Sequence, residues 1–270
     1  MALLARSTFP LDFAKASFRT HLNYIRCIEK LLSASSFSAS KIGTPFKKNA
    51  EITRFQKLYK VTVKSIKKDI ELAKEDSEFA VIVAPWFPVK CYYALYYLES
   101  IFVHLMDGTT HGFFKGGHAA IRKRMYSLRD TSAITFFSHE LDRVYLLAEI
   151  ETLPPITPGR NTRSDFWQHK QCHGSLMKRL MDYKLITDNK KWDLRKPIDR
   201  KEKIEYCGKN RLWLLDFFYW YRIKANYRDL DYIDFENGIA FSEILEYLEI
   251  YYKAFNIYRV GLVKQINTLL

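Results

Sequence analysis

The fold is decided by residues 84–108, which read APWFPVKCYYALYYLESIFVHLMDG. The segment opens with two prolines, Pro85 and Pro88, which suit the start of a helix. It closes on Asp107 and Gly108, a pair that favours the end of a helix. Between these ends, apolar side chains occupy nearly every face, and such a helix is stable only when other helices cover it. Residues 84–108 therefore predict the central helix of a bundle.

The composition of the whole chain favours the same class. Ten glycines and eight prolines in 270 residues are too few for the many turns of an all-β protein. Apolar residues make up 48% of the chain and aromatic residues 16%, which is far from the composition of disordered proteins. A chain of this length can also bury a substantial core. We therefore expect an all-α, multi-helix bundle.

The positions of the other helices follow from hydrophobic periodicity and from proline and glycine breaks. The expected helices are 10–34, 49–75, 118–129, 134–150, 164–186, 198–227 with a break near Gly208, and 238–268. The segment PPITPGRN at 154–161 is the clearest boundary, because three prolines and a glycine cannot continue a helix.

The elements on the two sides of this boundary do not look independent, so the sequence predicts one helical domain over residues 1–270. Its parts would be an N-terminal helix and linker (1–48), a helical core (49–150 and 198–270) and an inserted section (151–197).

The charge of the chain is unevenly distributed. The formal net charge is +13, with ten Lys or Arg and three acids in residues 41–74, but seven acids and no basic residue in 229–249. A surface of this kind attracts polyanions through part of its area, and RNA or DNA is the obvious polyanion. The candidate nucleic-acid-binding residues lie along helix 49–75 and in the basic helix 118–129; they are Lys57, Lys60, Lys64, Lys67, Lys68, Arg122 and Arg124. The simpler alternative for the lysines is a solvated helix face.

Several classes of protein lack their signatures here. The four cysteines, at 27, 91, 172 and 207, form no C-x-x-C pair, so neither a zinc knuckle nor a disulfide framework is indicated. No Gly-rich phosphate loop or dinucleotide fingerprint occurs, and no metal site or cofactor is expected. We find no signal peptide and no apolar run of the roughly 18 residues that a membrane span needs, so we expect a cytoplasmic protein with no membrane partner.

Two segments together resemble the HEPN superfamily of small helical bundles. The first is YYALYYL (92–98), inside the central helix, with His111 in the loop that follows. The second is RIKANYRD (222–229), at the end of the aromatic helix NRLWLLDFFYWY (210–221). In this superfamily a YYA helix closes with a Gly-containing turn, and a later helix carries an Arg, a spacer, a polar residue and a Tyr. The resemblance implies a four-helix core with additional helices, often dimeric.

The resemblance also implies a function. Many members are metal-independent endoribonucleases of toxin or defence systems, in which an Arg steadies the scissile phosphate and a His four to six residues later assists proton transfer. Arg222 matches the Arg, whereas Asn226 and Tyr227 occupy the window where these nucleases have His. His111 and His118, in the Gly-rich region after the central helix, are then the candidates for proton transfer, because imidazole titrates near neutral pH. These five residues form the predicted catalytic set of an RNA-binding or RNA-processing protein.

A catalytically silent interaction or dimerisation module is the alternative. In that case Arg222 pairs with Asp229 or Asp231. The acidic segment, with Glu243, Glu246 and Glu249, would face a basic partner. The partners that the sequence allows are thus RNA, a neutralising protein such as an antitoxin, and a second copy of the chain.

Overall fold

The computed structural model describes residues 18, 21–22, 24–29, 32–33, 50–107, 117–130, 191–209, 216–227 and 239–270. This part of the chain is almost entirely helical and contains no strand, so the predicted all-α, multi-helix class is confirmed. The helices expected at 134–150 and 164–186, the boundary at 154–161 and His111 lie outside the described residues.

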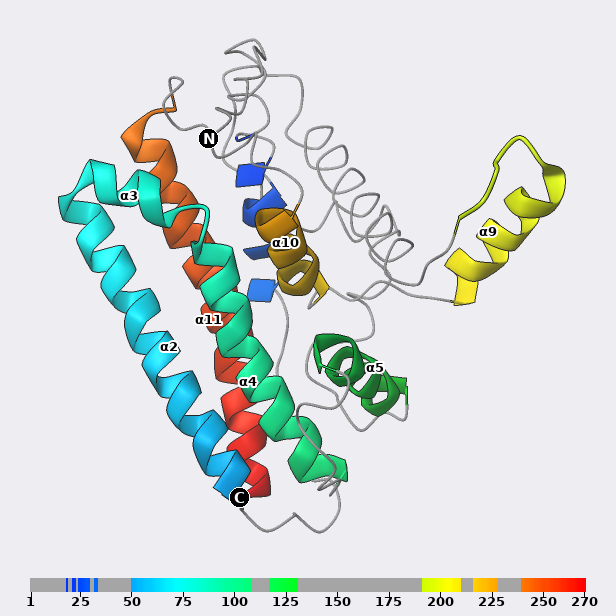
Figure 1. The fold of residues 1–270 in the computed structure, drawn as a ribbon, viewed down its shortest axis with the longest axis horizontal. Coiled ribbons are helices and arrows are strands. Elements are labelled where there is room, and N and C mark those ends of the chain that lie inside the picture. Colours follow the sequence, from blue (N-terminus) through cyan, green and yellow to red (C-terminus); the bar gives the residue numbers. More distant parts are fainter. Residues whose placement is uncertain are drawn as a thin grey trace, which may run out of the picture.

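The helices follow the order predicted from periodicity (Figure 1). They are α2 (Ala50–Glu75), α3 (Ser77–Val83), α4 (Phe87–Asp107), α5 (Gly117–Asp130), α9 (Pro197–Lys209), α10 (Asp216–Tyr227) and α11 (Phe241–Leu269). The described residues between 18 and 33 are also helical, and their apolar members Phe18, Leu22, Ile25, Ile28 and Leu32 are buried, as the sequence predicts.

Helix α4 lies at the centre of the bundle and packs against α2, α11, α10 and α5. Its side chains are buried on most sides, which confirms the prediction from residues 84–108. The helix begins at Phe87 rather than at residue 84, because residues 84–86 form a turn after α3. Pro88 is the second residue of α4, where its missing N–H costs no helical hydrogen bond.

Helix α2 is amphipathic in the way its sequence indicates. Ile52, Phe55, Ile66 and Ala73 are buried, and the helix packs against α4. The opposite face is exposed and basic, with Lys57, Lys60, Lys64, Lys67 and Lys68 all in solvent. Asp76 ends this helix and begins α3, since its Oδ1 accepts a hydrogen bond from the backbone N–H of Phe79 at 3.0 Å.

Helix α11 uses its acidic residues within the chain. Glu246 pairs with Arg26 of the N-terminal segment, and Glu249 lies 2.8 Å from Lys74 of α2. Glu243 accepts a hydrogen bond at 3.2 Å from the backbone N–H of Ala240, the residue before the helix. All three glutamates therefore have intramolecular partners. Glu246 and Glu249 are also partly exposed, so the expectation that this segment faces a basic partner stays a prediction.

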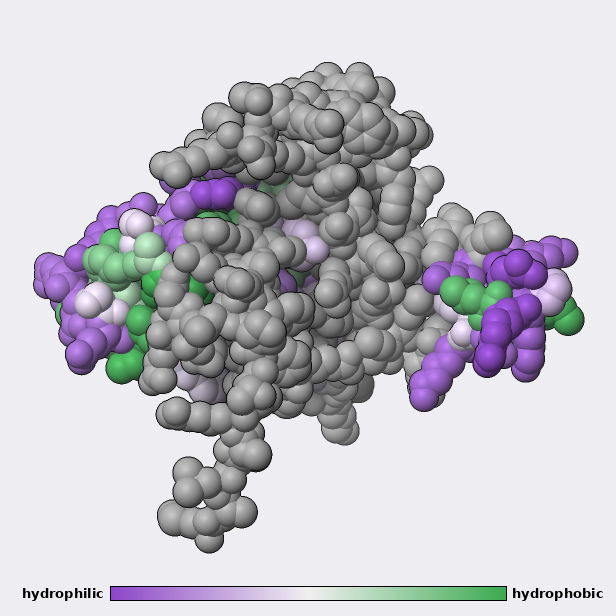
Figure 2. Space-filling view, turned by 90° about the horizontal axis from the view of Figure 1, so that it is seen from above, coloured by the Kyte–Doolittle hydropathy of each residue, from purple (hydrophilic) through white to green (hydrophobic). Residues whose placement is uncertain are grey.

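Helix α9 stands apart from the bundle in both views (Figures 1 and 2), and Figure 2 shows mostly hydrophilic residues on its surface. The loop before α9 packs against this helix through Trp192, whose ring centre lies 5.4 Å from that of Tyr206 in α9. Helices from the two sides of residues 151–197 pack together. Helix α4 precedes this section, and it contacts α10 and α11, which follow it.

Among the described residues, no single helix is long and apolar enough to cross a membrane. Helices α3 and α4 meet the requirements of length and composition only as a pair, and they are bent by 54° at the turn between them.

Candidate functional site

Tyr92 of α4 lies at the centre of a polar and aromatic cluster formed by three helices. Its side chain is only 2% exposed, and its hydroxyl lies 2.8 Å from Nδ1 of His118 at the start of α5. The guanidinium carbon of Arg222, from α10, lies 4.9 Å from the centre of the Tyr92 ring. The structure therefore brings His118 and Arg222 to the same tyrosine, although 103 residues separate them in the sequence.

Local geometry places His118 in this cluster. The preceding residue, Gly117, has a φ of 55°, a left-handed conformation that glycine adopts without strain. The His118 ring packs beside aromatic rings of α4, with its centre 4.3 Å from the ring centre of Tyr96 and 5.6 Å from that of Tyr93. An imidazole held on these sides has little freedom to turn away from Tyr92.

The environment also determines the charge of this imidazole. Burial, together with the positive charge of Arg222, lowers the pKa of His118 from 6.5 to about 4. His118 is therefore neutral at pH 7 and has one ring nitrogen that can accept a proton. Burial raises the pKa of Tyr92 well above 10, so its hydroxyl stays protonated beside Nδ1.

Arg222 is a buried cation. Its side chain is 7% exposed, and its guanidinium carbon lies 5.5 Å from the Tyr219 ring centre as well as over Tyr92. Within the described part of the chain it forms no ion pair, and its Nε has no hydrogen-bond partner. Contacts with two tyrosine faces offset part of the cost of burying this charge, but no carboxylate neutralises it there.

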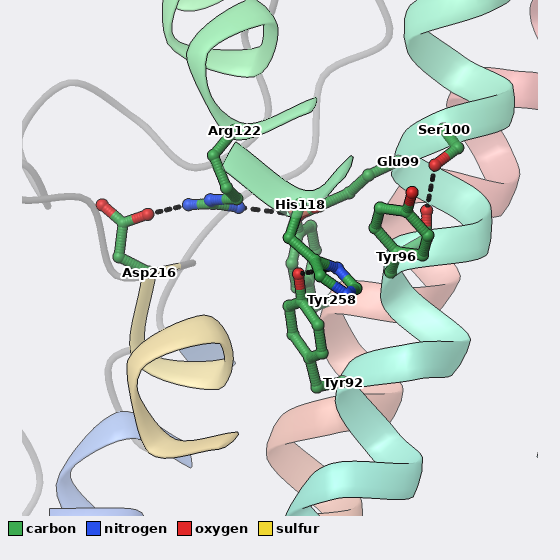
Figure 3. A network of polar contacts seen from close by, with 8 residues as sticks. All are labelled: Tyr92, Tyr96, Glu99, Ser100, His118, Arg122, Asp216 and Tyr258. Atoms are coloured by element: carbon green, nitrogen blue, oxygen red, sulfur yellow. Dashed lines mark hydrogen bonds and ion pairs between the residues drawn. The ribbon is translucent and has the colours of Figure 1, made fainter. Parts of the chain in front are cut away.

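A buried ionic network adjoins the cluster (Figure 3). Arg122 of α5 donates a hydrogen bond at 2.8 Å to Oε1 of Glu99 on α4 and also bonds Oδ1 of Asp216 on α10. The Tyr258 hydroxyl of α11 donates to the same Glu99 oxygen. We call Glu99, Arg122 and Asp216 the ionic triad. All three are at least nine-tenths buried, so each charge depends on its partners.

The ionic triad and the Tyr92 cluster are built from the same helices. Helix α5 contributes Arg122 to the triad one turn after His118. Helix α4 contributes Glu99 two turns after Tyr92, and Asp216 begins the helix that carries Arg222. The triad thus joins the three helices that present the cluster.

Comparison with known proteins adds no relative to this description. No family model, no curated protein and no solved structure matches the chain.

The structure brings two of the sequence-predicted site residues together and buries another. His118 and Arg222 meet at Tyr92, and the lysines of α2 and Arg124 are exposed. Arg122 was predicted to bind nucleic acid, but it is 5% exposed and held by two carboxylates, so that prediction is wrong. The backbone of Asn226 and Tyr227 belongs to α10, while their side chains lie outside the described part.

The sequence contained one indication of the ionic triad, which the prediction missed. Glu99 and Asp216 are acidic residues inside strongly apolar, aromatic helices, and a buried carboxylate needs a partner. Nothing in the sequence indicated that Arg122 is that partner. No group of three or more His, Cys, Asp or Glu side chains that could hold a metal ion occurs among the described residues.

The charge on Arg222 should be visible in the titration of His118. We expect the His118 imidazole to titrate at about pH 4, and Arg222→Gln to raise its pKa part of the way towards 6.5, because burial remains. NMR titration of the histidine ring protons measures both values. Arg195→Gln is the matched control, since that side chain is 93% exposed and pairs with Asp193 in the loop before α9. An unchanged His118 pKa in Arg222→Gln would contradict the assignment.

Proposed function

We propose that this chain is a HEPN-like, cytoplasmic RNA-binding or RNA-processing protein that acts as a metal-independent endoribonuclease of a toxin or defence system. The observation that carries the proposal is the meeting of His118 and Arg222 at Tyr92. The resemblance in sequence implies an Arg and a His acting together, and His118 supplies the imidazole that is missing from the four- to six-residue window after Arg222.

The two side chains fit complementary roles in cleavage of a phosphodiester. The Arg222 guanidinium carries a positive charge with no acidic partner among the described residues, so a phosphate oxygen is a suitable ligand for it. His118 is neutral at pH 7 and can accept the proton of an attacking 2′-hydroxyl. In the tautomer with its proton on Nδ1, the imidazole donates to the Tyr92 hydroxyl and leaves Nε2 as the nitrogen that accepts this proton. Charge stabilisation and proton transfer are then both supplied by side chains.

The exposed basic face of α2 supports the RNA-binding part of the proposal. Five lysines follow one another along the solvent side of this helix, opposite the side packed against α4. Such a row binds the phosphate backbone without reading its sequence, and its affinity falls with rising salt. Arg124 adds an exposed basic side chain on α5.

Cleavage of total RNA in the presence of EDTA tests this proposal. We expect cleavage by the wild-type protein and a decrease of about a hundredfold in rate for Arg222→Ala, the scale of losing one preorganised oxyanion donor. His118→Ala should lower the rate while leaving RNA retention on a filter nearly unchanged. Arg195→Ala, on the exposed loop before α9, is the control for a lost positive charge. Absence of cleavage together with equal RNA retention by all variants would refute the proposal.

A catalytically silent interaction module remains the second candidate, and one observation favours it. A base whose pKa is about 4 takes up protons weakly at neutral pH, so His118 is a poorer base than an ordinary histidine. On this alternative the protein binds RNA, a neutralising partner protein or a second copy without cleaving RNA. Static light scattering of the purified protein, alone and with co-expressed neighbouring-gene products, distinguishes a monomer from these assemblies.

A further inference from the structure

Arg122 and Arg222, both buried in the described part of the bundle, have opposite surroundings. Arg122 is bound by two carboxylates, Glu99 and Asp216, within the ionic triad. Arg222 is nearly as deeply buried, yet it has no acidic side chain within ion-pair distance in the described part of the chain, and its Nε is unbonded. An isolated charge in the interior is costly unless an anion accompanies it. The lack of a counter-charge for Arg222 among the described residues is therefore the observation that points to a site for an anionic ligand.

His118 is the titratable group that would respond to such a ligand. His118 and Arg222 both contact Tyr92. The ring centres of His118 and Tyr92 are 5.3 Å apart. The other groups around the His118 ring are the phenols of Tyr93 and Tyr96 on α4. Tyr219 of α10 packs against Tyr92, and Glu99 and Asp216 are already bound to Arg122. In the described residues, Arg222 is thus the charge that opposes protonation of His118.

We propose that the Arg222 site binds a phosphate-type oxyanion together with one proton, which His118 takes up from solvent. This inference rests on the proposed function for the identity of the site and concerns its regulation by pH. A negative ligand at Arg222 removes the repulsion between guanidinium and imidazolium, and it offers His118 an opposite charge. The hydroxyl of Tyr92 suits both states, because it can donate to neutral Nδ1 and accept from Nδ1–H of the imidazolium.

Thermodynamic linkage makes the consequence measurable. If the ligand raises the pKa of His118, then a proton must strengthen binding of the ligand by the same factor. Affinity therefore rises as pH falls from the pKa of the bound site towards that of the free site, by up to about tenfold per pH unit for one linked proton.

Inorganic sulfate is a suitable probe, because its charge is constant over the relevant pH range. Calorimetric titration of the full chain with sulfate at several pH values between 5 and 7 should show binding about tenfold tighter at the lowest pH than at the highest. NMR titration with and without saturating sulfate should show a higher pKa for His118 when sulfate is bound. Affinity that does not change with pH, or a His118 pKa that sulfate leaves unchanged, would overturn the inference.

Variants separate this coupling from general attraction of anions to a basic protein. Arg222→Gln should lose most sulfate binding, and His118→Gln should still bind sulfate but with little dependence on pH. Arg195→Gln should behave as the wild type, since its exposed side chain pairs with Asp193 outside the cluster. Circular dichroism confirms that each variant is folded. Binding that persists in Arg222→Gln would place the anion elsewhere and refute the site.

Failure of this inference can be distinguished experimentally from failure of the proposed RNA function. If sulfate binding and His118 protonation are coupled but RNA is neither cleaved nor retained, the inference stands and the RNA function fails. If RNA is cleaved in an Arg222-dependent way while sulfate has no effect on His118, the function stands and the coupling fails.

Discussion

Replacing Arg122 by methionine should destabilise the protein by about 3–5 kcal/mol, the usual cost of breaking a buried ion pair by removing one partner. Glu99 and Asp216 would remain buried with their charges unmatched, since both now bind the same guanidinium. The Tyr258 hydroxyl would still donate to Glu99, but one hydrogen bond cannot replace an opposite charge. The free energy of unfolding in urea, followed by circular dichroism, measures the loss.

The control for Arg122→Met is a substitution of the next residue in α5. Lys123 is exposed, so Lys123→Met should change the unfolding free energy by less than about 0.5 kcal/mol. The combined variant with Glu99→Gln, Arg122→Met and Asp216→Asn should recover much of the lost stability, because it removes the buried charges together. If Arg122→Met is as stable as Lys123→Met, then the triad does not hold the helices as described.

Truncating Tyr251 should produce a loss of similar size for a different reason. Tyr251 of α11 is fully buried, and its ring centre lies within 6.1 Å of those of five aromatic neighbours. These neighbours are Phe87, Phe217, Phe218, Tyr221 and Tyr247. Tyr251→Ala would leave a cavity where α4, α10 and α11 meet, and large aromatic truncations in cores cost about 3–5 kcal/mol. Urea unfolding again provides the measurement.

The matched variant keeps the ring. Tyr251→Phe retains every ring contact, so it should cost no more than about 1–2 kcal/mol. Equal losses in the two variants would show that the hydroxyl, rather than the packing of the ring, determines the contribution of Tyr251. Because α10 carries Arg222, we also expect Tyr251→Ala to weaken the His118–Arg222 interaction more than Tyr251→Phe does. The NMR titration of His118 measures that difference.

Much of the fold could be predicted from local sequence, because helix formation depends on near neighbours along the chain. The periodicity of α2 placed its bounds within one residue and separated its buried side from its lysines. The apolar character of residues 84–108 correctly predicted that α4 lies at the centre. The start of α4 was three residues off: Pro85 and Pro88 are both compatible with a first helical turn, and residues 84–86 form a turn between α3 and α4.

The candidate site was less predictable, because its members come from separate helices. Arg222 and His118 were named from a resemblance and from chemistry, but Tyr92, which joins them, was read only as part of an aromatic pattern. The sequence predicts Arg122 as a nucleic-acid-binding residue because it lies in a basic helix. Its burial follows from Glu99 and Asp216, which lie 23 and 94 residues away.

The sequence alone therefore determined the class of the fold, the central position of α4 and the basic face of α2. These properties follow from hydrophobic spacing, which each helix carries by itself. The tertiary structure decided which charges are buried, because α5 turns Arg122 towards two carboxylates and leaves Arg124 in solvent. It also decided that His118 meets Arg222. The physical reason is that pairing of buried charges depends on how helices rotate and pack against each other, which is a property of the assembled bundle.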